Sequence, residues 1–156
     1  MVASASNRKA PLYDARSFRS RDAVGALVAL ARKALADELG RELEPLGLSV
    51  QQALVLVLLA DEGVATAAQM CRELSHDAGA MTRLIDKLEA TGLVRRVRES
   101  HDRRAARLEL TKEGRAMHAQ VTRVQVAVLN RMLRGFSRAE ARTLERLLQR
   151  ILENAQ

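Results

Sequence analysis

The chain has 156 residues, of which 47% are hydrophobic and only 2% aromatic, and it carries a net charge of +7. This length fits one domain with its own core, and so few aromatic side chains argue against a single-strand binder that stacks bases on aromatic platforms. The single cysteine excludes an internal disulfide. Because the sequence shows no secretory signal and no apolar run of membrane-spanning length, we expect a cytoplasmic protein that is not bound to a membrane. The positive net charge indicates a polyanionic partner.

The N-terminal part of the chain predicts an arm followed by a long helix. Residues 1–18 are small, polar and aperiodic, which is typical of an arm that is ordered only where it docks. Apolar residues then recur at helical spacing until Pro45 and Gly47 interrupt them, which predicts a first helix at about 20–46.

Three helices in the middle of the chain each follow a residue whose side chain can accept a hydrogen bond from a first-turn amide. These predicted N-caps are Ser49, Thr66 and Asp77. The first of the three helices is almost wholly apolar and must be buried. The third carries apolar residues at i, i+3, i+4 and i+7 from Met81, and Gly92 ends it. The last two helices, joined by a short turn, predict a helix-turn-helix.

A basic β-ribbon is predicted directly after this motif. Residues 94–98 and 105–110 read as two strands joined by the loop HDRR at 101–104. Six arginines lie between Arg95 and Arg107 against two acidic residues, so more than half of the net charge gathers here. A solvated basic loop is the ordinary interpretation of such a charge run. Its place after a helix-turn-helix instead predicts a wing, and favours nucleic acid as the partner.

Two helices at about 112–154 complete the chain. Thr111 and Ser137 are their predicted N-caps, and Glu140 completes a capping box with Ser137. The apolar faces of these helices and of the helix at 20–46 exceed what one small winged domain can cover. We therefore expect a homodimer in which a second copy of the chain buries them.

Residues from about 48 to 118 resemble the MarR family of bacterial transcription regulators. The most specific pieces are TRLIDKLEATGLVRR at 82–96, with its apolar spacing and its glycine stop, and DRR at 102–104 followed by LELTKEGR at 108–115. Either piece alone is suggestive, and both occur here at the expected separation.

The resemblance implies a mainly α fold with a small β-wing. A winged helix-turn-helix at about 48–111 is flanked by N- and C-terminal dimerisation helices at about 20–46 and 112–154, all in one domain at 19–156 behind the arm. The family also implies an obligate homodimer that binds a pseudo-palindromic double-stranded operator. Release often follows binding of a small aromatic anion or oxidation of a cysteine.

The outward face of the helix that begins near residue 78 is expected to enter the major groove. The predicted DNA contacts on it are Ala78, Gly79, Thr82, Arg83 and Lys87. The side-chain-poor first turn admits the helix, and its amides can meet phosphate. Thr82 suits a thymine methyl or a phosphate, Arg83 suits bidentate contact with guanine, and Lys87 suits a phosphate or plain solvent. The alternative is a solvated face on which Arg83 pairs with Asp86.

The tip of the ribbon is expected to reach the adjacent minor groove, where an inserted arginine meets concentrated negative potential. We assign Arg103 to the groove. Asp102 is interpreted as the holder of Arg104, because a carboxylate two residues away can fix a guanidinium by a charge-assisted hydrogen bond. The two arginines can exchange these roles. The family's wing likewise carries an aspartate and arginines at this place.

A small-molecule effector is implied by the resemblance, which places the pocket between the dimer helices and the DNA-binding lobe. Candidates chosen by location alone are Tyr13, Phe18, Arg19, Arg21, Gln51, His76 and Arg83. An arginine near an apolar cleft suits a carboxylate or a phenolate. The expected function is therefore a DNA-binding regulator, a repressor relieved by an aromatic, phenolic or carboxylate ligand.

Two other functions remain open from the sequence. One is a redox- or metal-responsive regulator that uses Cys71, and the other is a helical protein-interaction module whose basic ribbon binds an acidic protein. We favour core packing for Cys71, because a buried free cysteine commonly behaves as a small hydrophobe. Cys71 and His76 do not by themselves make a metal site. Without a catalytic constellation or a cofactor motif, we expect no enzyme, no metal and no cofactor.

Overall fold

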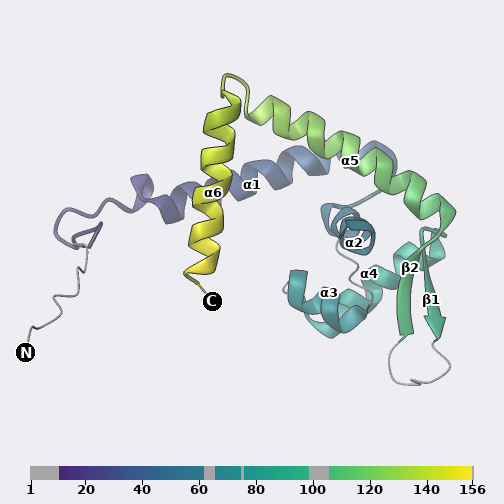
Figure 1. Ribbon diagram of the computed structural model, residues 1–156. Helices are drawn as coiled ribbons and strands as arrows, with labels where there is room; N and C mark the ends of the chain where they lie inside the picture. The colour runs from purple at the N-terminus through teal and green to yellow at the C-terminus, as the bar shows by residue number, and fades with distance from the viewer. Residues whose placement is uncertain (1–10, 62–65, 75, 99–105, 156) are drawn as a thin grey trace, which may run out of the picture. The chain divides into compact units, whose positions relative to one another are not determined.

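A computed structural model describes residues 11–61, 66–74, 76–98 and 106–155, and it is mainly helical with one small sheet (Figure 1). The elements in chain order are the 3-10 turn Ser20–Asp22, α1 (Val24–Leu43), the 3-10 turn Glu44–Leu46, α2 (Val50–Asp61), α3 (Ala67–Leu74), α4 (Ala78–Ala90), β1 (Val94–Arg98), β2 (Ala106–Leu110), α5 (Lys112–Met132) and α6 (Arg138–Glu153). The predicted fold class is confirmed. The described residues divide into two compact units, one up to Ala34 and one from Leu35 onward.

The first unit joins the arm to the start of α1. The rings of Tyr13 and Phe18 meet edge to face, with centroids 5.4 Å apart. The Val24 amide, at the first residue of α1, donates to the Tyr13 hydroxyl at 3.2 Å. Because the first amides of a helix have no partner inside it, this hydroxyl satisfies one of them and ties the arm to the helix.

The predicted N-caps are confirmed. The caps formed by side chains are Ser49, Thr66, Asp77, Thr111 and Ser137. Three of them are reciprocal capping boxes, since the side chains of Gln52, Gln69 and Glu140 accept from the backbone amide of the cap residue in return. Gly92 follows α4 with a φ of 71°, the left-handed conformation that glycine adopts readily.

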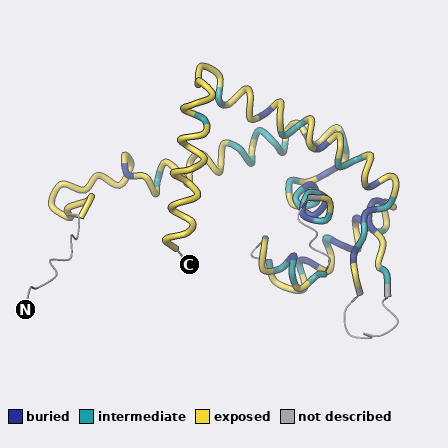
Figure 2. The backbone as a smooth tube through the Cα atoms, in the orientation of Figure 1, coloured by how far each residue is buried: buried dark blue, intermediate teal, exposed yellow. Residues whose placement is uncertain are grey.

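The core of the second unit is aliphatic and lies between α2, α4, the two strands and α5 (Figure 2). Its largest fully buried side chains include Leu43, Val55, Leu56, Met70, Met81, Ile85, Leu88, Val94 and Val121. The apolar helix α2 packs against α4, β2 and α5, as its composition requires. Helix α4 and the ribbon are therefore both anchored to the same core.

The start of α5 is packed tightly against the residue that precedes β1. The Thr111 hydroxyl accepts from the Gly114 amide at 2.9 Å and donates to the Gly92 carbonyl at 2.6 Å. A Cβ added to Gly114 would lie 1.9 Å from the carbonyl oxygen of Leu93. The glycine of the KEGR segment is therefore required by a backbone contact, which sequence patterns do not reveal.

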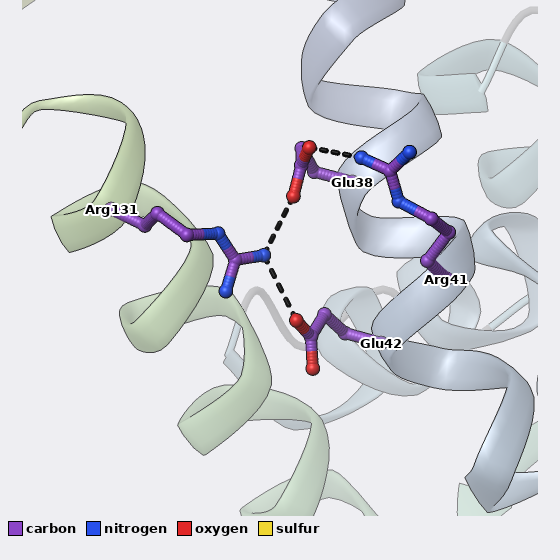
Figure 3. A network of polar contacts seen from close by, with 4 residues as sticks. All are labelled: Glu38, Arg41, Glu42 and Arg131. Carbon is purple, nitrogen blue, oxygen red and sulfur yellow. Dashed lines mark hydrogen bonds and ion pairs between the residues drawn. The ribbon is translucent and has the colours of Figure 1, made fainter.

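An ion-pair network joins the C-terminal half of α1 to α5 (Figure 3). The Arg131 guanidinium donates to Glu38 at 2.6 Å and to Glu42 at 2.9 Å, and Arg41 pairs with Glu38. The hydrogen bond from Arg131 is the main reason that the pKa of Glu38 lies below its ordinary value. These groups are solvated, so the network orients the two helices more than it stabilises the fold.

No single helix in the described ranges is both long and apolar enough to cross a membrane. Only residues 24–46 and 50–60, counted together as a bent pair, reach the needed length and composition.

Candidate nucleic-acid interface

Helix α4 has one anchored face and one open face. Met81, Ile85 and Leu88 are fully buried, which fixes the helix to the core. The five predicted contacts on α4 are all exposed: Ala78, Gly79, Thr82, Arg83 and Lys87. The periodicity of the sequence thus identified the outward face correctly.

The first turn of α4 is capped from within. Asp77 accepts from the Ala80 amide at 2.8 Å, and this hydrogen bond is the main cause of the lowered pKa of Asp77. The amide of Gly79 and the charge of Arg83 act in the same direction. The carboxylate of the cap therefore already takes the Ala80 amide, one of the first-turn amides that were expected to meet phosphate.

The side chains of Thr82 and Arg83 differ in what remains open to a ligand. The Thr82 hydroxyl donates to the Ala78 carbonyl at 2.8 Å, so its hydrogen is already used within the helix. The Arg83 guanidinium extends back over the first turn, where its Nη1 would lie 3.6 Å from a Cβ at Gly79. Glycine at this position leaves space for it. The alternative pair of Arg83 with Asp86 is not what the structure shows, since Asp86 binds Arg96 at 2.6 Å.

The ribbon arginines do not form one uniform basic cluster. Arg95 donates to Glu109 on the opposite strand at 2.7 Å, and Arg96 pairs with Asp86 and Glu89 of α4. Arg95 and Arg96 are thereby neutralised by carboxylates of the protein itself. Sequence reasoning missed both sets of partners.

The predicted wing tip lies outside the described residues, and so do its three assigned side chains, Asp102, Arg103 and Arg104. The strands that lead to it are described and antiparallel, with Val94 opposite Leu110 and Arg98 opposite Ala106. The predicted ribbon is therefore confirmed up to the point where the tip begins.

The effector candidates are divided between the two units. Tyr13, Phe18 and Arg19 line a cavity of about 220 Å³ in the first unit, together with Leu12, Asp14, Ser17, Asp22 and Ala23. Arg21 is not among the lining residues. Gln51, His76 and Arg83 belong to the second unit and do not line this cavity.

Cys71 packs against the core. Its side chain is half-buried against the main hydrophobic cluster, which confirms the packing role that we favoured. The neighbouring His76 has its ring Nδ1 2.7 Å from the Leu74 carbonyl. Within the described ranges, no group of three or more histidine, cysteine or acidic side chains is placed to hold a metal ion.

A helix-turn-helix supported by an aliphatic core and followed by a basic β-ribbon defines a winged-helix protein of the DNA-binding class. Residues 46–105 match the family model described as MarR family. The multiple antibiotic resistance protein MarR of Salmonella typhimurium is 30% identical over 130 residues, which cover 83% of this chain and 90% of that protein. The chain therefore belongs to the MarR family of transcription regulators.

Two solved structures extend the comparison. A cysteine-to-serine mutant of Escherichia coli MarR, complexed with operator DNA, has a TM-score of 0.73 and 28% identity over 82% of this chain and 92% of that one. A MarR family protein of Mycobacterium tuberculosis, in complex with salicylic acid, has a TM-score of 0.69 and 27% identity over 83% of this chain and 96% of that one. The fold and the family are thus shared with proteins crystallised with DNA and with an aromatic acid.

Proposed function

We propose that this protein is a cytoplasmic, homodimeric transcriptional repressor that binds a pseudo-palindromic operator through the exposed face of α4. The observation that carries the proposal is the open first half of α4. Its outward residues are small apart from Arg83, while the buried face holds the helix in place. A rigid helix whose exposed side chains are small, apart from one long hydrogen-bond donor in Arg83, is suited to a major groove.

The contacts on α4 are assigned by their chemistry. Arg83 is assigned to a guanine, because its planar guanidinium can donate two parallel hydrogen bonds to O6 and N7. Thr82 is assigned to a thymine, because its hydroxyl already donates within the helix and its methyl group can make an apolar contact with the thymine methyl group. Ala78 and Gly79 let the helix approach closely, and Lys87 is assigned to a phosphate.

Arg83→Ala should weaken operator binding by about 1–3 kcal/mol per half-site and relax the preference at one or two base pairs. Fluorescence anisotropy on duplexes from the protein's own upstream region, with single base pairs changed in turn, measures both effects. Arg142→Ala on α6 removes the same charge from an exposed position and serves as the control. Equal weakening on every duplex would reassign Arg83 to a phosphate.

An aromatic anion is proposed as the effector, and the cavity of the first unit is the candidate place. Tyr13 and Phe18 supply aromatic walls and Arg19 supplies a cation for a small aromatic carboxylate, in a lining that also includes Asp14 and Asp22. The salicylic acid bound by the mycobacterial relative supports this class of ligand.

Salicylate added to the fluorescence anisotropy titration of the operator duplex should lower the affinity of the protein for that duplex. Unchanged affinity at millimolar salicylate would contradict the proposal that the effector is an aromatic anion.

The homodimer is proposed from the exposed apolar residues of helices α1, α5 and α6. Large exposed apolar residues on them include Val24, Leu27, Val28, Leu30, Leu129, Met132, Leu144, Leu147, Leu148 and Ile151. Helix α6 has no buried residue (Figure 2). Its leucines nevertheless recur at the spacing of one helix face. So large an apolar surface is unusual on a monomer and typical of an interface.

Leu148→Glu should shift the protein toward monomers, because a carboxylate would have to be buried in the interface. Sedimentation velocity at micromolar concentrations measures the shift. Gln149→Glu adds the same charge one position along the exposed helix and should leave the dimer intact. A folded monomer for the unmodified chain at these concentrations would overturn the dimer proposal.

A further inference from the structure

Arg96 lies on the face of the ribbon that is turned toward the core. Residues directly opposite each other in an antiparallel pair share a face, and side chains alternate along each strand. Val94 pairs with Leu110 and Arg96 pairs with Leu108, so all four share one face. Val94 is 1% exposed and Leu108 3% exposed, which identifies this face as the buried one. The Arg96 side chain, only 33% exposed, therefore extends beside α4 and not into open solvent.

Three hydrogen bonds link this one residue to α4. The Arg96 guanidinium donates from Nη2 to Asp86 at 2.6 Å and from Nη1 to Glu89, and the Arg96 amide donates to Glu89 at 3.3 Å. Asp86 and Glu89 are three residues apart, so they stand on one side of the helix. Together the three residues join the C-terminal half of α4 to the first strand of the ribbon.

Arg95 provides an internal comparison. It carries the same charge on the opposite face of the ribbon, its side chain is 64% exposed, and it pairs with Glu109 of β2. That pair stays within the ribbon, whereas the pairs of Arg96 cross from the ribbon to α4. Two adjacent arginines of the basic cluster thus differ in what they hold together.

We propose that Arg96 is a positioning residue for DNA binding, which sets the wing against the recognition helix α4 through Asp86 and Glu89 and does not itself bind phosphate. The inference rests on the proposed DNA-binding function of α4. A helix in the major groove and a ribbon over the neighbouring backbone must both fit one duplex. If their relative orientation were free, binding would have to order it at the expense of affinity.

A double-mutant cycle on operator affinity tests the proposal, with Arg96→Ala on one side and Asp86→Asn with Glu89→Gln on the other. Each side should weaken binding about tenfold, and the combination should bind about as each does alone, because all remove the same link. The slope of log K against log salt should stay unchanged. Weaker binding after the removal of two acidic charges is the opposite of what charge counting predicts.

The competing role, a phosphate contact, gives different results. The carboxylate variants would then bind more tightly because Arg96 is freed, and Arg96→Ala would lower the salt slope by about 1 per subunit. Arg96→Lys separates the roles without removing the charge. A lysine retains a phosphate contact but cannot bridge two carboxylates as a planar guanidinium does, so it should bind as weakly as Arg96→Ala. If Arg96→Lys binds the operator with the affinity and the salt slope of the original chain, the proposal is overturned.

Measurements without DNA separate this proposal from the proposed function. Hydrogen exchange of the backbone amide at position 96 should accelerate in Arg96→Ala and in the double variant Asp86→Asn with Glu89→Gln. It should stay unchanged in Arg95→Ala. Far-UV circular dichroism checks that each variant is folded. Accelerated exchange together with no duplex binding by the original chain would refute the DNA-binding function and leave the link intact. Unchanged exchange and unchanged operator affinity in Arg96→Ala would refute the link.

Discussion

Gly114→Ala should severely destabilise the winged part of the protein, although it places a better helix former in the first turn of α5. Alanine inside a helix is ordinarily more stable than glycine by about 0.5–1 kcal/mol. Here the new Cβ would lie 1.9 Å from the Leu93 carbonyl oxygen and 3.3 Å from a methyl carbon of Leu110. The first contact is with backbone, which cannot move aside as the end of a side chain can.

The Leu93 carbonyl is also held from other directions. It accepts from the Thr111 amide at 3.1 Å and lies 3.3 Å from the Thr111 hydroxyl. Relief of the overlap would therefore shift the N-terminus of α5 away from the strand and break these contacts. We expect a loss of about 3 kcal/mol or more in the free energy of unfolding.

Chemical denaturation followed by circular dichroism measures the effect. Gly40→Ala is the matched control, because Gly40 is also helical and the nearest atom to its added Cβ is a Val50 methyl carbon at 3.9 Å. The control should be neutral or slightly stabilising. Equal stability of Gly114→Ala and the original chain would show that this close approach does not exist in solution.

Arg103→Ala and Asp102→Ala should both weaken operator binding, the second in spite of the acidic charge that it removes. An arginine in the minor groove interacts with concentrated negative potential, so its loss should lower affinity strongly. The slope of log K against log salt should fall by about 1 for each phosphate interaction lost. Arg95→Ala is the matched control, because Arg95 belongs to the same ribbon but is paired with Glu109.

The sign of the Asp102 result discriminates between two mechanisms. Charge counting predicts tighter binding when an acid beside a polyanion is deleted. A carboxylate that orients Arg104 predicts weaker binding, because the freed guanidinium loses its preset geometry. Titrating both variants against one operator duplex at several salt concentrations decides the matter. Tighter binding by Asp102→Ala at every salt would leave the tip as a diffuse basic patch.

Features that depend on neighbours in the chain could be predicted from the sequence alone. A helix cap is a bond between residues about three positions apart, as between Ser137 and Glu140, so its partners are visible in the sequence. The outward face of α4 follows from the helical period of its apolar residues. The strand alternation and the glycine stop at Gly92 are local in the same sense, and together these features define a winged helix-turn-helix.

Which side chains share a partner was decided only by tertiary structure. Asp86 had a candidate partner three residues away in Arg83, yet it binds Arg96, ten residues along the chain and beyond the turn at Gly92. Local spacing allowed a pair between Arg83 and Asp86, but the packing of β1 beside α4 brought Arg96 to the carboxylates of both Asp86 and Glu89. Gly114 is required for a similar reason, because its close neighbour is the backbone of Leu93, 21 residues earlier. Local periodicity places a residue on a face, and only the packing of one element on another determines what that face meets.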